Sequence, residues 1–399
     1  MKKSSVMWFP WLLVCYEISI YLSMDAYLPA FTRIANDFSV NAHMVQLTAL
    51  SWFVGGFVFQ VLIGPISDRY GRRPILLWGG VLYVVSSVAC AMAPNIHFLI
   101  VARLFQGMSM PTMYIAGYAA VNEMFDSTEA IKILARLNSV TILAPAFGPL
   151  LGGALLLWMP WHGIFLLLAA ISALALILLY FVMPETLSPQ NRSTRLHLGD
   201  ALRAYTTVIS NSRFMSYALI AFLPLVGLIA WMLAGAFMVI THFHYTTLDF
   251  GLIQTALFSG FILGNRLTSQ FINPHRQQRF INVGYTLILS GATLSVCFCL
   301  LMPDALFLFL ACFWLVELGV GLCIPVLSRL TLEASDAMMG VKVTVFSVMR
   351  MGSGFLGSIL ITYFYNATLL RIALIIAVFP LLALLFKVCM TSRFTAQPK

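Results

Sequence analysis

The chain has 399 residues, of which 61% are hydrophobic and only 9% are charged, and its formal net charge is +9. Soluble domains carry about 25% charged residues, so the composition excludes a mainly soluble protein and indicates an integral membrane protein. The basic residues are spread over short loops between apolar runs. This distribution is typical of membrane orientation signals and argues against a nucleic-acid-binding face.

Twelve apolar runs are long enough to cross a bilayer as helices. They lie at residues 8–32, 45–66, 74–93, 97–119, 133–158, 163–183, 214–241, 250–271, 280–301, 305–330, 340–363 and 369–390. The longest polar stretch separates the sixth run from the seventh. We therefore predict an all-α membrane protein with an N-terminal half (1–183) and a C-terminal half (214–399) of six helices each, joined by a linker (184–213).

Basic residues concentrate on one side of the predicted membrane. The turns after even-numbered runs and the two ends of the chain contain Arg69, Arg72, Arg73, Lys132, Arg136, Arg192, Arg195, Arg203, Arg213, Arg276, Arg279, Lys342, Lys2, Lys3, Lys387, Arg393 and Lys399. The turns after odd-numbered runs contain only Arg33 and Arg371. Because cytoplasmic loops are enriched in Lys and Arg, both termini and the linker are predicted to be cytoplasmic.

The first run contains two carboxylates, Glu17 and Asp25. A charge near the bilayer centre costs from about 2.5 to more than 10 kcal/mol, depending on the scale, and usually marks a binding or proton-relay site. At a rise of about 1.5 Å per residue, Glu17 lies about 13 Å from the cytoplasmic face and Asp25 about 12 Å further out. We expect Glu17 to take up a proton or a cation. The structural alternative is a carboxyl group kept neutral by burial.

A basic residue, Arg103, lies in the fourth run. This run starts outside, near His97, so Arg103 is about 9 Å below the outer face, at a depth similar to that of Asp25. Pairing the two residues lowers the cost of burying both charges. The functional hypothesis is a protonation-sensitive pair, and the alternative is a fixed structural ion pair.

The turn after the second run reads GPISDRYGRRP. Its glycine and charged residues are Gly64, Asp68, Arg69, Gly71, Arg72 and Arg73. The first glycine permits a neighbouring helix to approach closely. The aspartate stands near a helix end, where it can meet basic residues or the positive N-terminus of another helix. The length of the motif favours a conformational latch over a merely topological basic loop.

The fifth run contains the sequence APAFGPLLGG at 144–153. Pro145 and Pro149 each remove a backbone donor and bend a helix. Gly148 leaves a smooth helix face that permits close packing. Ordinary helix packing overlaps with the functional interpretation here, in which the bend shapes access to the site.

These segments, together with ARLFQG at 102–107, resemble the three signature motifs of drug:proton antiporters of the major facilitator superfamily. The Tyr-Glu pair of the first run, followed eight residues later by Asp, also resembles this family. So do GYAAVNEMF (117–125), MPWHGIF (159–165), MPET (183–186) and RLTLEASD (329–336). Ala144 stands where the third motif of the family has Gly.

The resemblance implies a twelve-helix major facilitator fold and proton-driven export of lipophilic, often cationic, compounds. It assigns substrate and proton binding to Glu17 and Asp25, the central arginine of the family to Arg103, and the gating aspartate to Asp68. Two further residues fall inside matching segments and are candidates on that ground: Gln106 for gating and Tyr118 for substrate binding. An aromatic ring suits a lipophilic cation through its area and through cation–π contact.

Two further charges, Glu317 and Arg350, lie in the middle of the tenth and eleventh runs, outside the family pattern. Both are near the bilayer midplane, about 18 Å and 15 Å from the faces where their runs start. One interpretation is a mutual ion pair within the C-terminal half. In the other, Glu317 is a second titratable site, or Arg350 admits an anionic group.

We therefore predict a proton-coupled multidrug antiporter of the bacterial inner membrane, and not an enzyme, that exports lipophilic cationic and neutral compounds. The sequence has no Walker A motif and no Cys/His metal spacing, so no cofactor is expected. The expected partners are protons, small lipophilic drugs and membrane lipid, without nucleic acid, and the chain is expected to be a monomer. Two alternatives stay open: a dedicated exporter of one metabolite, such as a siderophore or a polyamine, and a non-transporting receptor or scaffold.

Overall fold

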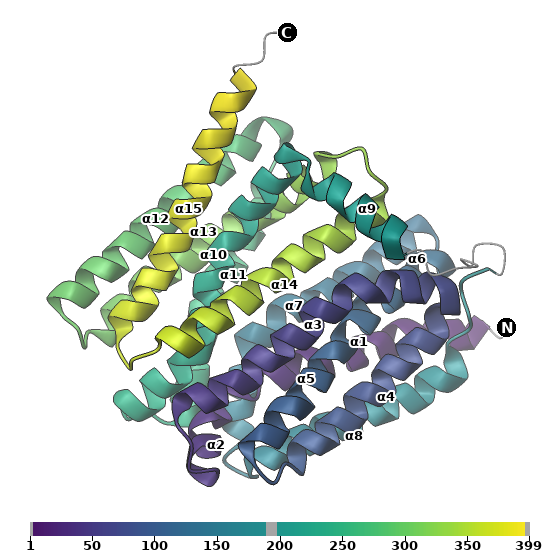
Figure 1. Cartoon of the computed structure of the whole chain (residues 1–399), viewed down its shortest axis with the longest axis horizontal. Helices are drawn as coiled ribbons and strands as arrows, with labels where there is room; N and C mark the ends of the chain where they lie inside the picture. The colour runs from purple at the N-terminus through teal and green to yellow at the C-terminus, as the bar shows by residue number, and fades with distance from the viewer. Residues whose placement is uncertain (1–2, 189–197, 396–399) are drawn as a thin grey trace. The chain divides into compact units, whose positions relative to one another are not determined.

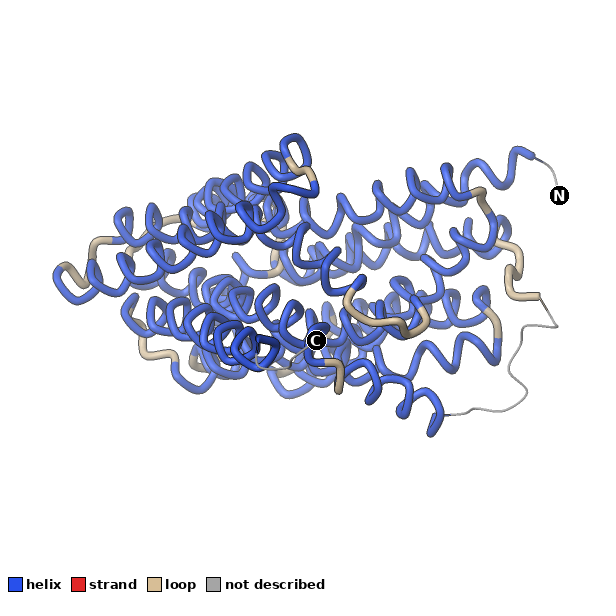
Figure 2. The backbone as a smooth tube through the Cα atoms, turned by 90° about the horizontal axis from the view of Figure 1, so that it is seen from above, coloured by secondary structure: helices blue, strands red, loops and turns tan. Residues whose placement is uncertain are grey.

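The computed structural model describes residues 3–188 and 198–395, which form helices and the turns between them, with no strand among them (Figure 2). Four of the basic residues used to predict orientation, Lys2, Arg192, Arg195 and Lys399, lie outside this part. The chain divides into two compact units. The first unit is Met1–Gly199 with Thr246–Gly251, and the second is Asp200–Tyr245 with Leu252–Lys399.

The helices of the first unit are drawn from purple to teal in Figure 1. They are α1 (Lys3–Asp25), η1 (Leu28–Ala30), α2 (Phe31–Asp37), α3 (Ala42–Tyr70), α4 (Arg72–Ala91), α5 (Ile96–Thr112), η2 (Met113–Gly117), α6 (Tyr118–Met124), α7 (Ser127–Leu155) and α8 (Trp161–Val182). Within this unit, α3 packs on α5, α4 packs on α5 and α8, and α1 packs on α7 and α8.

The remaining helices are drawn from teal to yellow in Figure 1. They are α9 (Leu198–Ile209), α10 (Ser212–Ala236), η4 (Phe237–His242), α11 (Thr247–Phe271), η5 (Pro274–Arg276), α12 (Gln277–Leu301), α13 (Leu306–Glu333), α14 (Met339–Phe364) and α15 (Leu369–Thr395). In the second unit, α10 packs on α13, α14 and α15, and α12 packs on α13 and α15.

The predicted membrane-spanning helices correspond to helices of the structure. In the described part of the chain, 10 helices are long and apolar enough to cross a membrane. The two other predicted spans are α1 and the continuous helical run α5–η2–α6, Ile96 to Met124. The prediction of an all-α membrane fold is therefore confirmed, and each of the twelve predicted runs overlaps a helical segment. Large apolar side chains such as Trp78 and Phe181 are exposed on these helices, as expected where a protein surface faces lipid.

The predicted linker contains one helix that its polar composition does not predict. Residues Leu198–Ile209 form α9. The sequence predicts only a linker here, because the stretch begins with the polar residues PETLSPQNRSTR. Its apolar residues recur at helical spacing, which produces one apolar face on an otherwise polar helix.

Candidate substrate and proton site

Glu17 lies in the middle of α1 and only 1% of its surface is exposed. The Tyr118 hydroxyl donates a hydrogen bond of 3.0 Å to its Oε1 atom. Tyr118 is the first residue of α6 and directly follows the π-helical turn η2. Single π turns inside α-helices occur often at functional sites. Here the turn precedes the residue that contacts the buried acid, and two predicted candidates are thereby brought together.

Asp25 is the last residue of α1 and is 3% exposed. The α7 helix passes directly over it. A Cβ atom placed on Gly148 would lie 2.5 Å from the Asp25 Cβ, and one placed on Gly152 would lie 2.0 Å from the Ala26 carbonyl oxygen. Gly148 and Gly152 of APAFGPLLGG therefore pack against the end of α1 that carries the acid. Pro145 and Pro149 lie inside the same helix.

Arg103 is fully buried in α5. Its guanidinium donates to the Ser23 carbonyl oxygen at 3.0 Å and lies 3.2 Å from the Met24 sulfur. It also stacks over the Tyr27 ring, with 4.7 Å from Cζ to the ring centroid. The carbonyl end of a helix carries partial negative charge, which favours a cation at this place. The end of α1 is thus the main binding surface for the arginine.

The predicted ion pair between Arg103 and Asp25 is not formed. In residues 3–188 and 198–395, no contact within 4.0 Å joins the Arg103 guanidinium to the Asp25 carboxyl group. The guanidinium instead contacts the two residues that precede the aspartate in α1. The rise per residue estimates how deep a residue lies in the membrane. It does not give the direction in which the side chain points, so two residues at equal depth need not meet.

Gln106 extends the contacts of Arg103. Its Oε1 atom accepts a hydrogen bond from the guanidinium, and its amide nitrogen donates to the Ser87 hydroxyl at 2.8 Å. The residue therefore connects α5 to both the arginine and α4. Gln106 is a gating candidate by resemblance, and the structure shows it as a partner of the central arginine.

Arg72 is the centre of the polar cluster formed by GPISDRYGRRP. It forms ion pairs with Asp68 at 2.6 Å and with Glu123 at 3.1 Å, and it donates to the Ser67 hydroxyl at 3.0 Å. Its backbone N–H, at the start of α4, donates to Glu185 at 3.0 Å. A carboxylate in that position stabilises the positive end of the helix.

Glu123 and Glu185 are not among the site residues predicted from the sequence. Both lie inside segments that resemble the family, GYAAVNEMF and MPET. They are 51 and 113 residues away from Arg72 in the chain, so local spacing gives no signal of the contact. Basic residues that are partly buried need acidic partners. Only this requirement indicated that the turn would contact acidic residues elsewhere in the chain.

The other residues of this turn occupy separate places. Gly71 has φ of 103°, and a Cβ atom there would lie 2.1 Å from a Glu185 carboxyl oxygen, so only glycine fits without displacing that side chain. Arg73 donates to the Tyr180 carbonyl at 2.7 Å. Arg69 stacks on Tyr70. Gly64 lies inside α3, six residues before its end.

Glu317 lies in α13 and is 1% exposed. One of its carboxyl oxygens is buried without a hydrogen-bond partner, and among the described residues no basic group lies within ion-pairing distance. The predicted ion pair with Arg350 of α14 is therefore not formed. The pair was suggested only because both residues lie near the bilayer midplane. Depth in the membrane does not show which faces of two helices are in contact.

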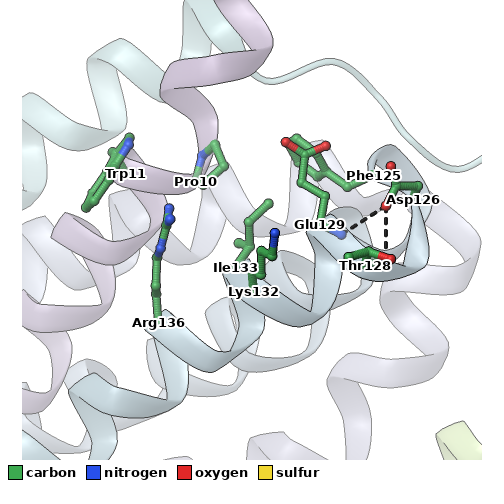
Figure 3. Close-up of a pocket in the computed structure, with 9 residues that line it drawn as sticks. All are labelled: Pro10, Trp11, Phe125, Asp126, Thr128, Glu129, Lys132, Ile133 and Arg136. Carbon is green, nitrogen blue, oxygen red and sulfur yellow. Dashed lines mark hydrogen bonds between the residues drawn. The ribbon is translucent and has the colours of Figure 1, made fainter.

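A cavity of about 360 Å³ opens near the N-terminal end of α1 (Figure 3). Its lining residues are Pro10, Trp11, Phe125, Asp126, Thr128, Glu129, Lys132, Ile133 and Arg136. The Asp126 carboxylate caps the first turn of α7, and the Arg136 guanidinium lies 5.0 Å from the centroid of a Trp11 ring. None of the predicted proton or substrate residues lines this cavity.

Comparison with known proteins agrees with the fold. The family model described as Major Facilitator Superfamily matches residues 13–358. The chain belongs to the major facilitator superfamily. It is 32% identical over 343 residues to the multidrug transporter MdfA of Escherichia coli O157:H7. The aligned segment covers 86% of this chain and 83% of that relative. It is 33% identical over 348 residues to the MdfA of Edwardsiella ictaluri, with 87% and 84% covered.

Solved structures of the superfamily share the fold at low sequence identity. A POT family transporter in complex with a thioalcohol-conjugated peptide matches with a TM-score of 0.74 at 12% identity and 96% coverage of both chains. A bacterial homologue of the human lysosomal transporter Spinster matches with a TM-score of 0.71 at 13% identity and 97% coverage of both chains. The membership makes this protein a transporter with many membrane-spanning helices.

Proposed function

We propose that the protein is a proton-coupled multidrug antiporter that exports lipophilic cationic and neutral compounds across the bacterial inner membrane. The observation that carries the proposal is the buried carboxyl group of Glu17, which accepts a hydrogen bond from Tyr118 in the middle of a membrane helix. Buried acids in such helices usually serve substrate binding or proton transfer. The similarity to MdfA proteins of several bacteria supports multidrug substrates.

The proposed cycle uses the two acids of α1. From the outer side, Glu17 or Asp25 takes up a proton and becomes neutral. When the site opens to the cytoplasm, a cationic substrate competes with that proton for the carboxylate, and an apolar pocket with Tyr118 contacts its lipophilic part. A neutral substrate displaces the proton through contact and conformational coupling. A membrane potential supplies about 2.3 kcal/mol per charge per 100 mV.

The fixed charge of Arg103 has a separate role in this proposal. Its contacts with Ser23, Met24 and Gln106 are all uncharged, so the cation keeps its place whether or not Asp25 is protonated. A nearby positive charge favours the ionised form of a carboxyl group. Arg103 therefore helps Asp25 to release its proton once the site faces the cytoplasm.

Inverted membrane vesicles with an acidified interior test the proposal. The wild-type protein should accumulate ethidium, and a proton ionophore should abolish the accumulation. Glu17→Gln should remain in the membrane and lose ethidium transport, whereas Glu333→Gln, at an exposed position of α13, should behave as wild type. Flux of a siderophore or polyamine without ethidium flux would replace the proposal by that of a dedicated exporter. Flux that resists the ionophore would refute proton coupling.

A further inference from the structure

The two units contain the same pair of close helix contacts. In the first unit, a Cβ atom on Gly55 of α3 would lie 2.2 Å from the Leu104 carbonyl oxygen, and one on Gly107 of α5 would lie 2.0 Å from the Trp52 carbonyl oxygen. Each contacted carbonyl is three residues before the glycine of its own helix. The contact is therefore reciprocal, and it fixes the register of α3 against α5.

The same contact occurs in the second unit between α11 and α13. A Cβ atom on Gly264 would lie 2.4 Å from the Leu318 carbonyl oxygen, and one on Gly321 would lie 2.2 Å from the Phe261 carbonyl oxygen. Again each carbonyl is three residues before the glycine of its helix. Since α3 and α5 are the second and fourth spans of their half, and α11 and α13 those of the other, the two halves repeat each other here.

A second pair of contacts repeats between the third and first spans of each half. The Tyr83 hydroxyl of α4 donates to the Ser19 carbonyl of α1 at 2.6 Å. The Tyr285 hydroxyl of α12 donates to the Ile220 carbonyl of α10 at 2.5 Å. These contacts align α10 with α1, so that Ile220 is equivalent to Ser19. In the same way the glycine contacts align α13 with α5, so that Gly321 is equivalent to Gly107.

This register matches Glu317 with Arg103. Arg103 is four residues before Gly107, and Glu317 is four residues before Gly321. One helical turn separates each charged residue from its glycine, so both point from the same face of their helix. The second half thus has a buried acid at the position where the first half has its buried base.

The residues that contact Arg103 in the first unit have apolar counterparts in the second. Counted from Tyr285 and its partner Ile220, and from Gly321, the counterparts of Ser23, Met24, Tyr27 and Gln106 are Pro224, Leu225, Leu228 and Val320. None of these side chains carries a hydrogen-bond donor or a charge. The matching positions therefore offer nothing that stabilises an ionised carboxylate.

Charged residues also occur on the helices that pack against α13. In the described part of the chain they are Arg213 of α10, Asp249 and Arg266 of α11, Arg279 of α12, Lys342 and Arg350 of α14, and Arg371, Lys387 and Arg393 of α15. None of the basic groups whose side chains the structure describes forms an ion pair with Glu317.

We propose that Glu317 is a second proton-carrying carboxyl group, located in the second unit at the place that Arg103 occupies in the first. It is neutral while its surroundings are closed and apolar, and it releases its proton when a cation or water reaches it. The proposal rests on the proposed proton antiport. It adds that each half contributes its own proton carrier, so that more protons are exchanged per substrate than the acids of α1 alone provide.

The first experiment counts the protons released when purified protein in unbuffered detergent solution binds tetraphenylphosphonium. Glu317→Gln keeps the size and polarity of the side chain but cannot ionise. We expect this variant to bind the cation and to release about one proton fewer per bound cation than wild type, and Glu333→Gln on the same helix to match wild type. An unchanged proton count in Glu317→Gln would overturn the proposal.

The second experiment detects the proton on Glu317 without substrate. Infrared difference spectra between wild type and Glu317→Gln at neutral pH should contain the carbonyl stretch of a protonated carboxyl group, and this band should vanish at alkaline pH. Absence of the band, with a carboxylate signal in its place, contradicts the proposal even if transport is not coupled to protons. If the band is present and wild type releases no proton on binding, Glu317 carries a proton and the antiport function is wrong.

Discussion

Gly148 of α7 and Asp25 of α1 lie in direct contact, with 2.5 Å between the Asp25 Cβ and the position of a Cβ on residue 148. This contact joins the proline- and glycine-rich segment of the fifth span to the acid of the first. A movement of α7 therefore acts directly on the surroundings of the acid. The segment that resembles a transport motif therefore packs directly against an acid that we propose as a proton carrier.

Gly148→Ala should reduce transport without removing the protein from the membrane. The added methyl group has no room, and inserting a methyl group into a packed site costs about 1–3 kcal/mol. We expect about a 5- to 100-fold loss in ethidium transport by vesicles. The control is Gly340→Ala, because a Cβ on Gly340 would meet nothing within 4 Å. Equal transport by the two variants would show that the contact with Asp25 has no functional effect.

Tyr118→Phe should change the pH dependence of substrate binding. The hydroxyl stabilises the ionised form of Glu17, and a hydrogen bond to a charged group contributes about 1.5–3 kcal/mol. Without it the carboxylate holds its proton more tightly, so a higher pH is needed before a cation displaces the proton. We expect the midpoint of tetraphenylphosphonium binding to rise by about 1–2 pH units.

The control for this variant is Tyr180→Phe. The Tyr180 side chain is exposed, and its contacts with Arg73 use the backbone carbonyl and the ring face, which phenylalanine keeps. Its binding profile should follow wild type at every pH. A Tyr118→Phe profile that also follows wild type would remove Tyr118 from the site.

Gln106→Leu should destabilise the protein. It removes an acceptor from the Arg103 guanidinium and a donor from the Ser87 hydroxyl, and each buried polar group left without its partner costs about 1–3 kcal/mol. Thermal unfolding in detergent measures the effect. Gln46→Leu is the matched control, because the Gln46 amide is buried without hydrogen-bond partners in the described part of the chain. A melting temperature of Gln106→Leu at or above that of Gln46→Leu would contradict the assigned network.

Arg72→Lys should impair transport although the charge is kept. A lysine ammonium cannot reproduce the fork that reaches Asp68, Glu123 and Ser67 together. We expect transport to fall about tenfold or more, a loss of about 1.4 kcal/mol in the free energy of the transport step. Arg329→Lys, in an exposed ion pair with Glu333, should transport normally because such pairs contribute about 0–1 kcal/mol. Normal transport by Arg72→Lys would show that the charge alone suffices.

The sequence predicted the membrane spans well because length and hydropathy carry most of that information. The predicted run 280–301 and the observed α12, Gln277–Leu301, differ only at their start. The helix α9 escaped prediction because its apolar residues occupy one face of a short polar segment. The π turn before Tyr118 has no sequence signature, so its position could come only from the structure.

The site was predictable in part. The burial of Glu17, Asp25 and Arg103 could be predicted from their position within apolar runs. A charged side chain in a membrane-spanning helix faces the protein interior, because exposure to lipid is costly. The contacts of these residues could not be predicted, because the direction of a side chain depends on helix rotation, which hydropathy does not give. For the same reason the predicted ion pair of Arg103 with Asp25 is not formed, and neither is the pair of Glu317 with Arg350, which was one of two interpretations. The match between Glu317 and Arg103 needed the glycine contacts of both units.

The most direct test of proton coupling through α1 is the release of protons when substrate binds. Purified wild type, Glu17→Gln and Asp25→Asn are compared in unbuffered detergent solution, with tetraphenylphosphonium and with a neutral drug. We predict that wild type releases protons with both substrates and that each variant loses part of this release, so that the acid used by each substrate is identified. Substrate binding without proton release in wild type, or release that is unchanged in both variants, would contradict the account.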